Sequence, residues 1–341
     1  MARSHYRTLT IAWVLFGCTM PKPDDDPAPE PGRPDSVEAS CEAAELACGN
    51  APVQSDALSF GRGCCETTWI PGGTFKMGFP PSDVDGHEHG VFVSAFFLDR
   101  FEITLGRFLT HFRNHPEPPD PGSGAHPRIA ESGWQSEWND ALLKTPENVV
   151  EELVACGAGL DPDVVEAVLN GEPVEDPAAL EMLHRPMPCL SWFAAFAFCL
   201  WDGGRLPTEA EWEFAATGGS DDRPYPWGAA DISLATELAD AMPEPEPVGK
   251  HERARGRYGQ DDLAGGVFEW VLDWYAPDFY STAGLDCHDC ANLSYGAMLS
   301  RSLRGAPDGH VDDSDFRSES RNSGAPGSTR FAPYGVRCAR D

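Results

Sequence analysis

The chain has 341 residues, which is long enough to bury a substantial hydrophobic core in one large domain or two ordinary ones. It carries 55 acidic residues against 25 basic ones, a formal net charge of −30, which argues against nucleic acids and anionic membrane surfaces as partners. Glycine (34 residues) and proline (31 residues) are both abundant, so the composition predicts much irregular loop rather than long helices or strands.

Residues 1–17 have the pattern of a secretory signal. Arg3 and Arg7 precede a short apolar run over residues 9–17, and Gly17 stands directly before Cys18. A small residue followed by cysteine resembles a lipobox, in which Cys18 is lipidated and becomes the new N-terminus. The alternative is an ordinary signal peptide with an incidental cysteine, and both interpretations predict export. The run is too short for a transmembrane helix, and no later segment is apolar for long enough to form one.

Residues 18–65 are expected to form a tether and a cysteine-containing lead-in. The stretch 19–39 is rich in proline and acidic residues and has almost nothing to bury, which predicts an extended linker. It would hold a folded domain, residues 66–341, away from the membrane, so the membrane is touched only through an N-terminal lipid anchor.

The cysteine count is consistent with export. Of the 11 cysteines, ten remain when Cys18 is set aside, and an oxidising compartment allows them to form up to five disulfides. Cys287-His-Asp-Cys290 is the only C-x-x-C motif and has no second one to complete a zinc site, so it predicts a local disulfide or cross-links to other cysteines. The sequence leaves open how six of the cysteines pair: Cys41, Cys48, Cys64, Cys65, Cys287 and Cys290.

Residues 189–216 predict two helices joined by a tight turn. Ser191 is a good N-cap before the apolar run 192–201, Gly203-Gly204 ends that run, and Pro207-Thr208-Glu209 opens the next helix. On the second helix Trp212 and Ala216 share one face. The three acidic residues of this helix are expected to point mostly outward: Glu209, Glu211 and Glu213.

Six short blocks, in order, resemble the sulfatase-modifying-factor family, whose namesake is the formylglycine-generating enzyme. They include Trp-Ile-Pro-Gly-Gly-Thr-Phe-Lys-Met-Gly at residues 69–78, Arg-Leu-Pro-Thr-Glu-Ala-Glu-Trp-Glu at 205–213 and Tyr-Gly-Val-Arg-Cys-Ala-Arg at 334–340; the other blocks are residues 96–104, 226–228 and 262–270. The resemblance covers residues 66–341. It implies an α+β domain related to C-type lectins, with low regular secondary structure and stapled by disulfides.

An insertion at about residues 114–186 interrupts the resemblance. It contains two helix-like runs, at 146–154 and 162–170. Cys156 lies near its middle and Cys189 just past its end, which predicts a disulfide that staples the insertion to the core. An insertion beside a cleft can carry specificity; the alternative is a peripheral surface elaboration.

The resemblance also locates the family's chemistry, in which a pair of reactive cysteines binds copper and the substrate cysteine. No cysteine occurs between residues 291 and 337 of this chain. The two reactive positions fall around residues 308–310 and at about Asp313, and Ser318 replaces a further family cysteine. We therefore predict no catalytic residue, no copper and no formylglycine generation. The candidate cleft residues are Asp308, His310, Asp313, Arg317 and Arg321.

Two interpretations of this segment stay open. Its carboxylates and imidazole are ligands that hard metals accept, which would suit an enzyme of altered chemistry such as a metal-dependent oxidase. The alternative is an acidic, solvated loop.

Two structural features are implied by the resemblance. The family binds calcium in the block at 262–270, which assigns the ligands here to the side chains of Asp262 and Glu269 and the carbonyls of Gly265 and Val267. The family also pairs the terminal cysteine, Cys338, with a helix cysteine that corresponds to Cys199. Together these features describe a lipid-anchored protein of the cell envelope with a non-catalytic binding or scaffold role, whose partner is an unknown peptide, glycan or envelope component.

Overall fold

The computed structural model describes residues 65–78, 89–114, 117–156, 159–229, 232–240, 246–280, 282, 287–295, 299–309, 313–327 and 333–341. All of them belong to one compact unit, Gly32–Asp341. The expected signal, Cys18 and most of the tether lie outside the described residues, as do Cys41, Cys48 and Cys64. No helix in the described part of the chain is long and apolar enough to cross a membrane.

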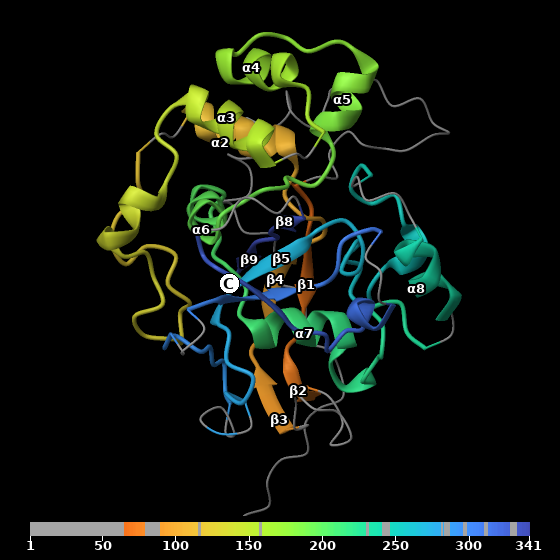
Figure 1. Ribbon diagram of the computed structural model, residues 1–341. Coiled ribbons are helices and arrows are strands. Elements are labelled where there is room, and N and C mark those ends of the chain that lie inside the picture. The colour runs from red at the N-terminus through yellow and green to blue at the C-terminus, as the bar shows by residue number, and fades with distance from the viewer. Residues whose placement is uncertain are drawn as a thin grey trace, which may run out of the picture. The chain divides into compact units, whose positions relative to one another are not determined.

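In the described part of the chain, nine short strands form three small sheets (Figure 1). The first has the order β1 (Thr67–Ile70), β4 (Phe96–Asp99), β9 (Ala339–Arg340), and the second pairs β2 (Gly73–Met77) with β3 (His89–Val93). The third has the order β7 (Asn322–Gly324), β6 (Arg301–Arg304), β5 (Phe268–Trp274), β8 (Tyr334–Gly335). Only β5 and β8 run parallel, and the register of β4 and β9 sets Phe97 opposite Arg340. The C-terminus is thereby paired with an early strand.

Most helices are also short. They are α2 (Leu105–Asn114), α3 (Pro146–Cys156), α4 (Pro162–Asn170), α5 (Pro177–Leu183), α6 (Trp192–Trp201), α7 (Glu209–Thr217) and α8 (Ile232–Ala239). Four 3-10 turns accompany them: η2 (Ser136–Ala141), η3 (Gly219–Asp221), η4 (Glu252–Ala254) and η5 (Asp313–Phe316). The small sheets, short helices and long loops agree with the expected α+β class with low regular secondary structure.

The helix pair predicted around residues 189–216 is present as α6 and α7. The Ser191 hydroxyl accepts a hydrogen bond from the amide of Ala194, and Thr208 forms a capping box with Glu211 at the start of α7. The expected outward direction of the acidic residues of α7 is wrong, because Glu209, Glu211 and Glu213 are all buried. The helical periodicity of the apolar residues does not show that each of these three acids has an arginine partner.

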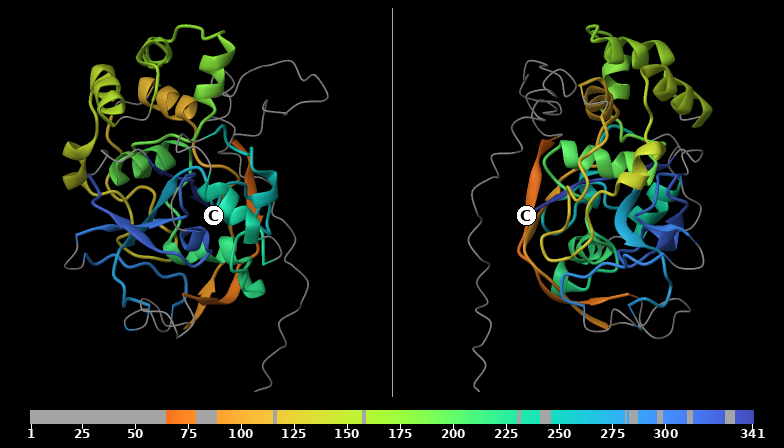
Figure 2. Two further views of the ribbon diagram at one scale, coloured as in Figure 1. Left: turned by 45° about the vertical axis from the view of Figure 1, so that its right-hand side comes forward. Right: turned by 90° about the vertical axis from the view of Figure 1, so that its left-hand side faces the viewer.

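The insertion contains both predicted helices, as α3 and α4, and adds α5. Figure 1 shows these three helices grouped around α2 at one end of the view, and they stay together in both views of Figure 2. Each begins with a proline, and Asp161 and Asp176 cap α4 and α5. The helices bury apolar faces in the main hydrophobic core, where Leu153 and Val165 join Phe108 and Phe196. The insertion is therefore a packed part of the domain.

Three disulfides staple the described part of the chain. The structure joins Cys199 to Cys338 and Cys156 to Cys189, the two pairs that the sequence analysis expects, and it joins Cys287 to Cys290. The first connects α6 to the C-terminal segment over a sequence separation of 139 residues. The second ties the end of α3 to the chain before α6, so the insertion is held to the core at its middle.

Candidate functional site

The expected cleft residues follow β6 in the chain, and the described ones contact other side chains of the domain. Asp308 is buried after β6, and its Oδ2 atom lies 3.8 Å from Nε2 of His251. The Asp308 carboxylate raises the pKa of that histidine, whereas burial opposes the shift. His310 lies outside the described residues, and Asp313 begins the 3-10 turn η5.

The two arginines of the predicted cleft are both tied to carboxylates. Arg317 donates from Nε to Oε1 of Glu319 at 2.8 Å. Arg321 donates from Nε and a terminal nitrogen to the two carboxylate oxygens of Glu209, at 2.7 Å and 2.9 Å. Ser318, which stands between these arginines, is fully buried, and its hydroxyl donates to the carbonyl of Ala216. These three side chains therefore make contacts within the folded domain.

A buried ion-pair network centres on α7. Arg304 on β6 contacts both Glu209, at 3.3 Å, and Glu213, at 2.8 Å. Arg205 contacts Glu211 through both terminal nitrogens, at 2.7 Å and 2.8 Å. Buried charges require such partners, because removing a lone charge from water is very costly.

The network shifts several pKa values in opposite directions. Burial opposes ionisation of Glu209, but the guanidinium groups of Arg321 and Arg304 outweigh it and lower the pKa of this carboxyl. For Glu213, burial raises the pKa to about 7 in spite of Arg304. Burial and the charge of Glu209 likewise raise the pKa of Asp273 to about 7, although the Asp273 carboxylate accepts hydrogen bonds from two backbone amides and from Tyr280.

The expected calcium loop contains carboxylate oxygens that lack hydrogen bonds. Oδ1 of Asp262 and both carboxylate oxygens of Glu102 are buried and have no hydrogen-bond partner among the described residues. Burial and the charge of Asp262 raise the pKa of Glu102 well above its usual value, and burial raises that of Asp262 to about 6. The backbone of Gly266 lies against Glu102, since a Cβ at that glycine would stand 2.2 Å from Oε1. A terminal nitrogen of Arg337 lies 3.9 Å from Oε2 of Glu102 and partly compensates its charge. Buried carboxylate oxygens without hydrogen bonds suit a hard cation.

Glu269, another expected calcium ligand, has different partners. Its carboxylate accepts hydrogen bonds from Nε and a terminal nitrogen of Arg337, at 2.7–2.9 Å, and from the indole of Trp212 at 2.8 Å. Arg337 also donates to the backbone carbonyls of Asp261 and Asp262. The structure thus links the backbone of Asp262 to Glu269 through Arg337. Glu102, whose pKa the charge of Asp262 raises, is a further carboxylate here that the sequence analysis does not name.

One further group of potential metal ligands occurs among the described residues: Asp99, Asp202 and Cys338. Cys338 is in a disulfide, and both aspartates form ion pairs with Arg107 and Arg340. This group is therefore part of the core.

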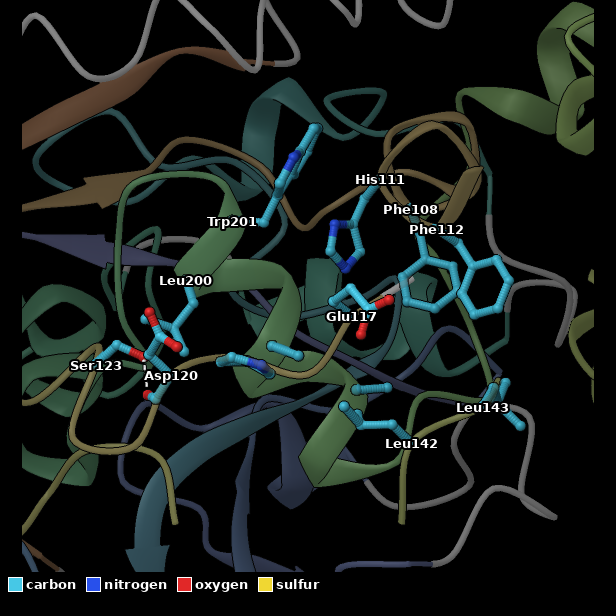
Figure 3. A pocket seen from close by; sticks show the side chains of 13 residues that line it. Phe108, His111, Phe112, Glu117, Asp120, Ser123, Leu142, Leu143, Leu200 and Trp201 are labelled. Atoms are coloured by element: carbon cyan, nitrogen blue, oxygen red, sulfur yellow. Dashed lines mark hydrogen bonds between the residues drawn. The ribbon is translucent and has the colours of Figure 1, made fainter. Parts of the chain in front are cut away.

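A pocket of about 280 Å³ lies where α2 and α6 meet the insertion. Figure 3 shows the imidazole of His111 with the rings of Phe108 and Phe112, all from α2, and Trp201 from the end of α6. Leu142 and Leu143 of the insertion complete the apolar lining, and two exposed acidic residues, Glu117 and Asp120, contribute the charged groups. An apolar pocket with a few polar groups is the usual form of a small-molecule site.

A second pocket of about 210 Å³ adjoins the first. It shares Phe108, Leu143 and Ala194 with it, and it is otherwise lined mainly by apolar residues of α3 and of the chain before α6, such as Val149 and Met187. Neither lining includes the residues of the predicted cleft. These two pockets therefore lie at the insertion and away from the described residues of the segment 308–321.

Comparison with known proteins decides the family. The model of the sulfatase-modifying factor enzyme 1-like domain matches residues 55–341. The chain belongs to this family. The match begins somewhat before residue 66, where the sequence analysis places the start of the domain.

The sulfatase-modifying factor family includes relatives with several names. "Inactive C-alpha-formylglycine-generating enzyme 2" of Mus musculus is 30% identical over 277 residues, which cover 75% of this chain and 86% of that protein. The formylglycine-generating enzyme of Thermomonospora curvata is 28% identical over 232 residues, 62% of this chain and 73% of that protein. "Serine/threonine-protein kinase pkn1" of Chlamydia caviae is 28% identical over 277 residues; 81% of this chain matches, but it spans only 38% of that protein.

Solved structures agree on the fold. The structure of PvdO from Pseudomonas aeruginosa aligns with a TM-score of 0.50 at 19% identity, covering 81% of this chain and 94% of that one. This similarity confirms the expected formylglycine-generating-enzyme-like α+β fold.

The pocket under the insertion is the feature that sequence reasoning missed. The sequence did contain signals, because Phe108 and Phe112 stand at i, i+4 on α2 and Leu142-Leu143 interrupts a polar stretch. Those signals predict packing, however, and do not show where packing is incomplete. The pocket depends on how the insertion settles against α2 and α6, which the family motifs do not encode.

Proposed function

We propose that this protein is a non-catalytic member of the sulfatase-modifying factor family that acts as an exported binding protein. One observation carries the proposal: the segment where the resemblance places the family's reactive cysteines contains no thiol, and three of its described side chains make structural contacts. Asp308 is buried beside His251, and the hydroxyl of Ser318 donates a hydrogen bond to the carbonyl of Ala216. Arg321 forms an ion pair with Glu209. A thiolate pair is what monovalent copper and thiol exchange require.

The relatives support this proposal to the extent of their names. A protein called an inactive formylglycine-generating enzyme is as similar to this chain as a protein called an active one. The fold therefore accompanies both kinds of role, and the site decides between them. Kinase activity is not carried over from pkn1, because the matched region is a minor part of that protein.

We further propose that Cys18 carries a lipid and that the tether displays the domain on the cell envelope. Three disulfides in the described residues support an oxidising location. In this proposal a structural calcium is held by Asp262 and the loop carbonyls of Gly265 and Val267, with Glu102 and Glu269 as the carboxylates around it. The partner is a component of the envelope or its surroundings, and the pocket beneath the insertion is the place where a ligand binds.

The second candidate is an enzyme of altered chemistry that uses a metal near Asp308. It is favoured by one observation, the buried Oδ1 atom of Asp308, which has no hydrogen-bond partner among the described residues. Such an enzyme would retain a redox metal that is lost in Asp308→Asn.

The decisive experiment is an assay of the purified full chain. It is incubated with copper, oxygen and a cysteine-containing peptide of the sulfatase type, the peptide is analysed by mass spectrometry, and bound metals are quantified. We expect that the cysteine thiol of the peptide is not converted to an aldehyde. We also expect that the protein contains no stoichiometric copper or other redox metal. Conversion of the peptide at a catalytic rate would overturn the proposed function, and a stoichiometric redox metal would favour the second candidate.

A further inference from the structure

The pocket between α2, α6 and the insertion combines an aromatic wall with negative charge. The ring of His111 lies 4.9 Å from that of Trp201 and 5.5 Å from that of Phe198, and Phe108 stacks on Phe198 at 6.4 Å. Aromatic faces of this kind attract cations as well as apolar groups. Figure 3 shows Glu117 beside this wall and Asp120 toward Ser123.

The carboxylates of the pocket have no lysine or arginine beside them among the described lining residues. Glu117 and Asp120 both line it, and the one basic side chain of the lining is the imidazole of His111. Within the described residues, neither carboxylate forms an ion pair. The buried acids of α7, by contrast, each contact an arginine. Because two carboxylates face a partly enclosed apolar space, a cationic group is the electrostatic complement of this pocket.

The shape indicates what the cation is attached to. The first pocket, of about 280 Å³, lies at the small end of ligand pockets, and the second adds about 210 Å³ beyond the shared residues Leu143 and Ala194. The second lining is mostly apolar, with Val149, Leu153 and Met187, and it has one acid and no base. An elongated hydrocarbon would therefore be buried along Phe108 and continue past Ala194.

We infer that this pocket binds a small amphipathic amine: an ammonium group paired with Glu117 or with Asp120, which line different sides of the pocket, on an unbranched hydrocarbon chain that lies along the aromatic wall. The inference rests on the proposed function, since it names the ligand class of the proposed binding site. An anionic or neutral ligand of equal length loses the carboxylate contacts, and an inorganic cation gains nothing from the apolar wall.

The test is calorimetric titration of the full chain with n-butyl-, n-hexyl- and n-octylammonium, together with octanol and octanoate. We expect affinity to rise by about fourfold for each methylene that becomes buried. Octylammonium is expected to bind at least tenfold more tightly than octanol, and octanoate not to bind. Glu117→Gln and Asp120→Asn are each expected to weaken octylammonium binding by about threefold, as for a partly exposed ion pair.

Two further variants keep the inference falsifiable. Glu137→Gln removes an exposed acid of the insertion that does not line the pocket, and it should leave the affinity unchanged. Ala194→Met fills the junction of the two pockets. In this variant, octylammonium should bind no more tightly than hexylammonium. Equal binding of octanol and octylammonium, or an unchanged affinity in the Glu117→Gln, Asp120→Asn double variant, would overturn the inference.

The outcome is separable from that of the proposed function. Amine binding together with conversion of the cysteine peptide would leave this inference standing and remove the non-catalytic role. If the peptide is not converted and no amine binds, the non-catalytic role stands and this inference is wrong.

Discussion

Arg321 and Glu209 form a two-point ion pair inside the protein, in which the guanidinium reaches both carboxylate oxygens at 2.7 Å and 2.9 Å. The Glu209 side chain is fully buried and that of Arg321 is 10% exposed. The pair joins the first turn of α7 to the segment in which the family has its reactive cysteines. Arg321, a residue of the predicted cleft, is therefore engaged in a stabilising contact.

Removal of one partner should be strongly destabilising. Arg321→Ala leaves the Glu209 carboxylate buried with Arg304 as its remaining cation, so we expect the free energy of unfolding to fall by about 3–5 kcal/mol. Urea denaturation measures the change. The matched control is Arg253→Ala, which breaks an exposed ion pair with Glu237 and should cost less than about 1 kcal/mol. Equal losses in the two variants would contradict the structural role given to Arg321.

The buried carboxyls predict a stability that falls between pH 5 and pH 8. Glu213 and Asp273 have pKa values of about 7 in the folded protein, against about 4 for an unfolded chain. Because the folded pKa is the higher one, the stabilisation is complete below about pH 4 and is lost as the pH rises through about 7. Glu209 and Glu211, whose pKa values are lowered, contribute stability that is lost only under acidic conditions, so they do not offset this fall.

The measurement is the free energy of unfolding at both pH values. We expect each of the two groups to contribute roughly 1–3 kcal/mol to the difference. Glu213→Gln should reduce the difference, whereas Asp140→Asn, at an exposed position, should leave it unchanged. A wild-type stability that is flat or rising over this range would rule out the raised pKa values.

The sequence predicted the parts of the fold that depend on local punctuation and on family motifs. Ser191, Pro207 and Thr208 set the bounds of α6 and α7, and the prolines of the insertion marked α3 and α4. The sequence did not reveal that Glu209, Glu211 and Glu213 are buried, because the compensating arginines lie far away in the chain. The helical periodicity of the sequence predicts which face of a helix is apolar. It does not predict which arginine, distant in the chain, will contact an acidic side chain on that helix.

The same reason explains the candidate site. The loss of thiols was visible in the sequence as an absence of cysteine. The pocket was not visible, since its lining comes from Phe108 on α2, Ala194 on α6 and Leu143 in the insertion, and a cavity exists only where such elements fail to fill the space between them.

The two disulfides of very different span should differ in their stabilising effect. In the chain-entropy model, the pair of Cys199 and Cys338, 139 residues apart, contributes roughly 5 kcal/mol, and that of Cys287 and Cys290, three apart, roughly 2 kcal/mol. Thermal and urea unfolding of the Cys199→Ala, Cys338→Ala variant should therefore show a much larger loss than the Cys287→Ala, Cys290→Ala variant. Similar losses would indicate that native contacts of the cysteines, rather than the closed loop, determine the effect.

Calcium should stabilise the protein if the open oxygens of Asp262 and Glu102 contribute to its site. A ligand that binds only the folded state at 100 times its dissociation constant adds about 2.7 kcal/mol. We expect calcium to raise the melting temperature of the wild-type chain and chelation to lower it. In Glu102→Gln the response should shrink strongly, because a carboxylate ligand to a hard cation is replaced by a neutral amide. Asp222→Asn, at an exposed position away from this loop, serves as the control and should keep the full response. An unchanged response in Glu102→Gln would remove Glu102 from the site and leave Asp262 and Glu269 as the two carboxylates that the family pattern names.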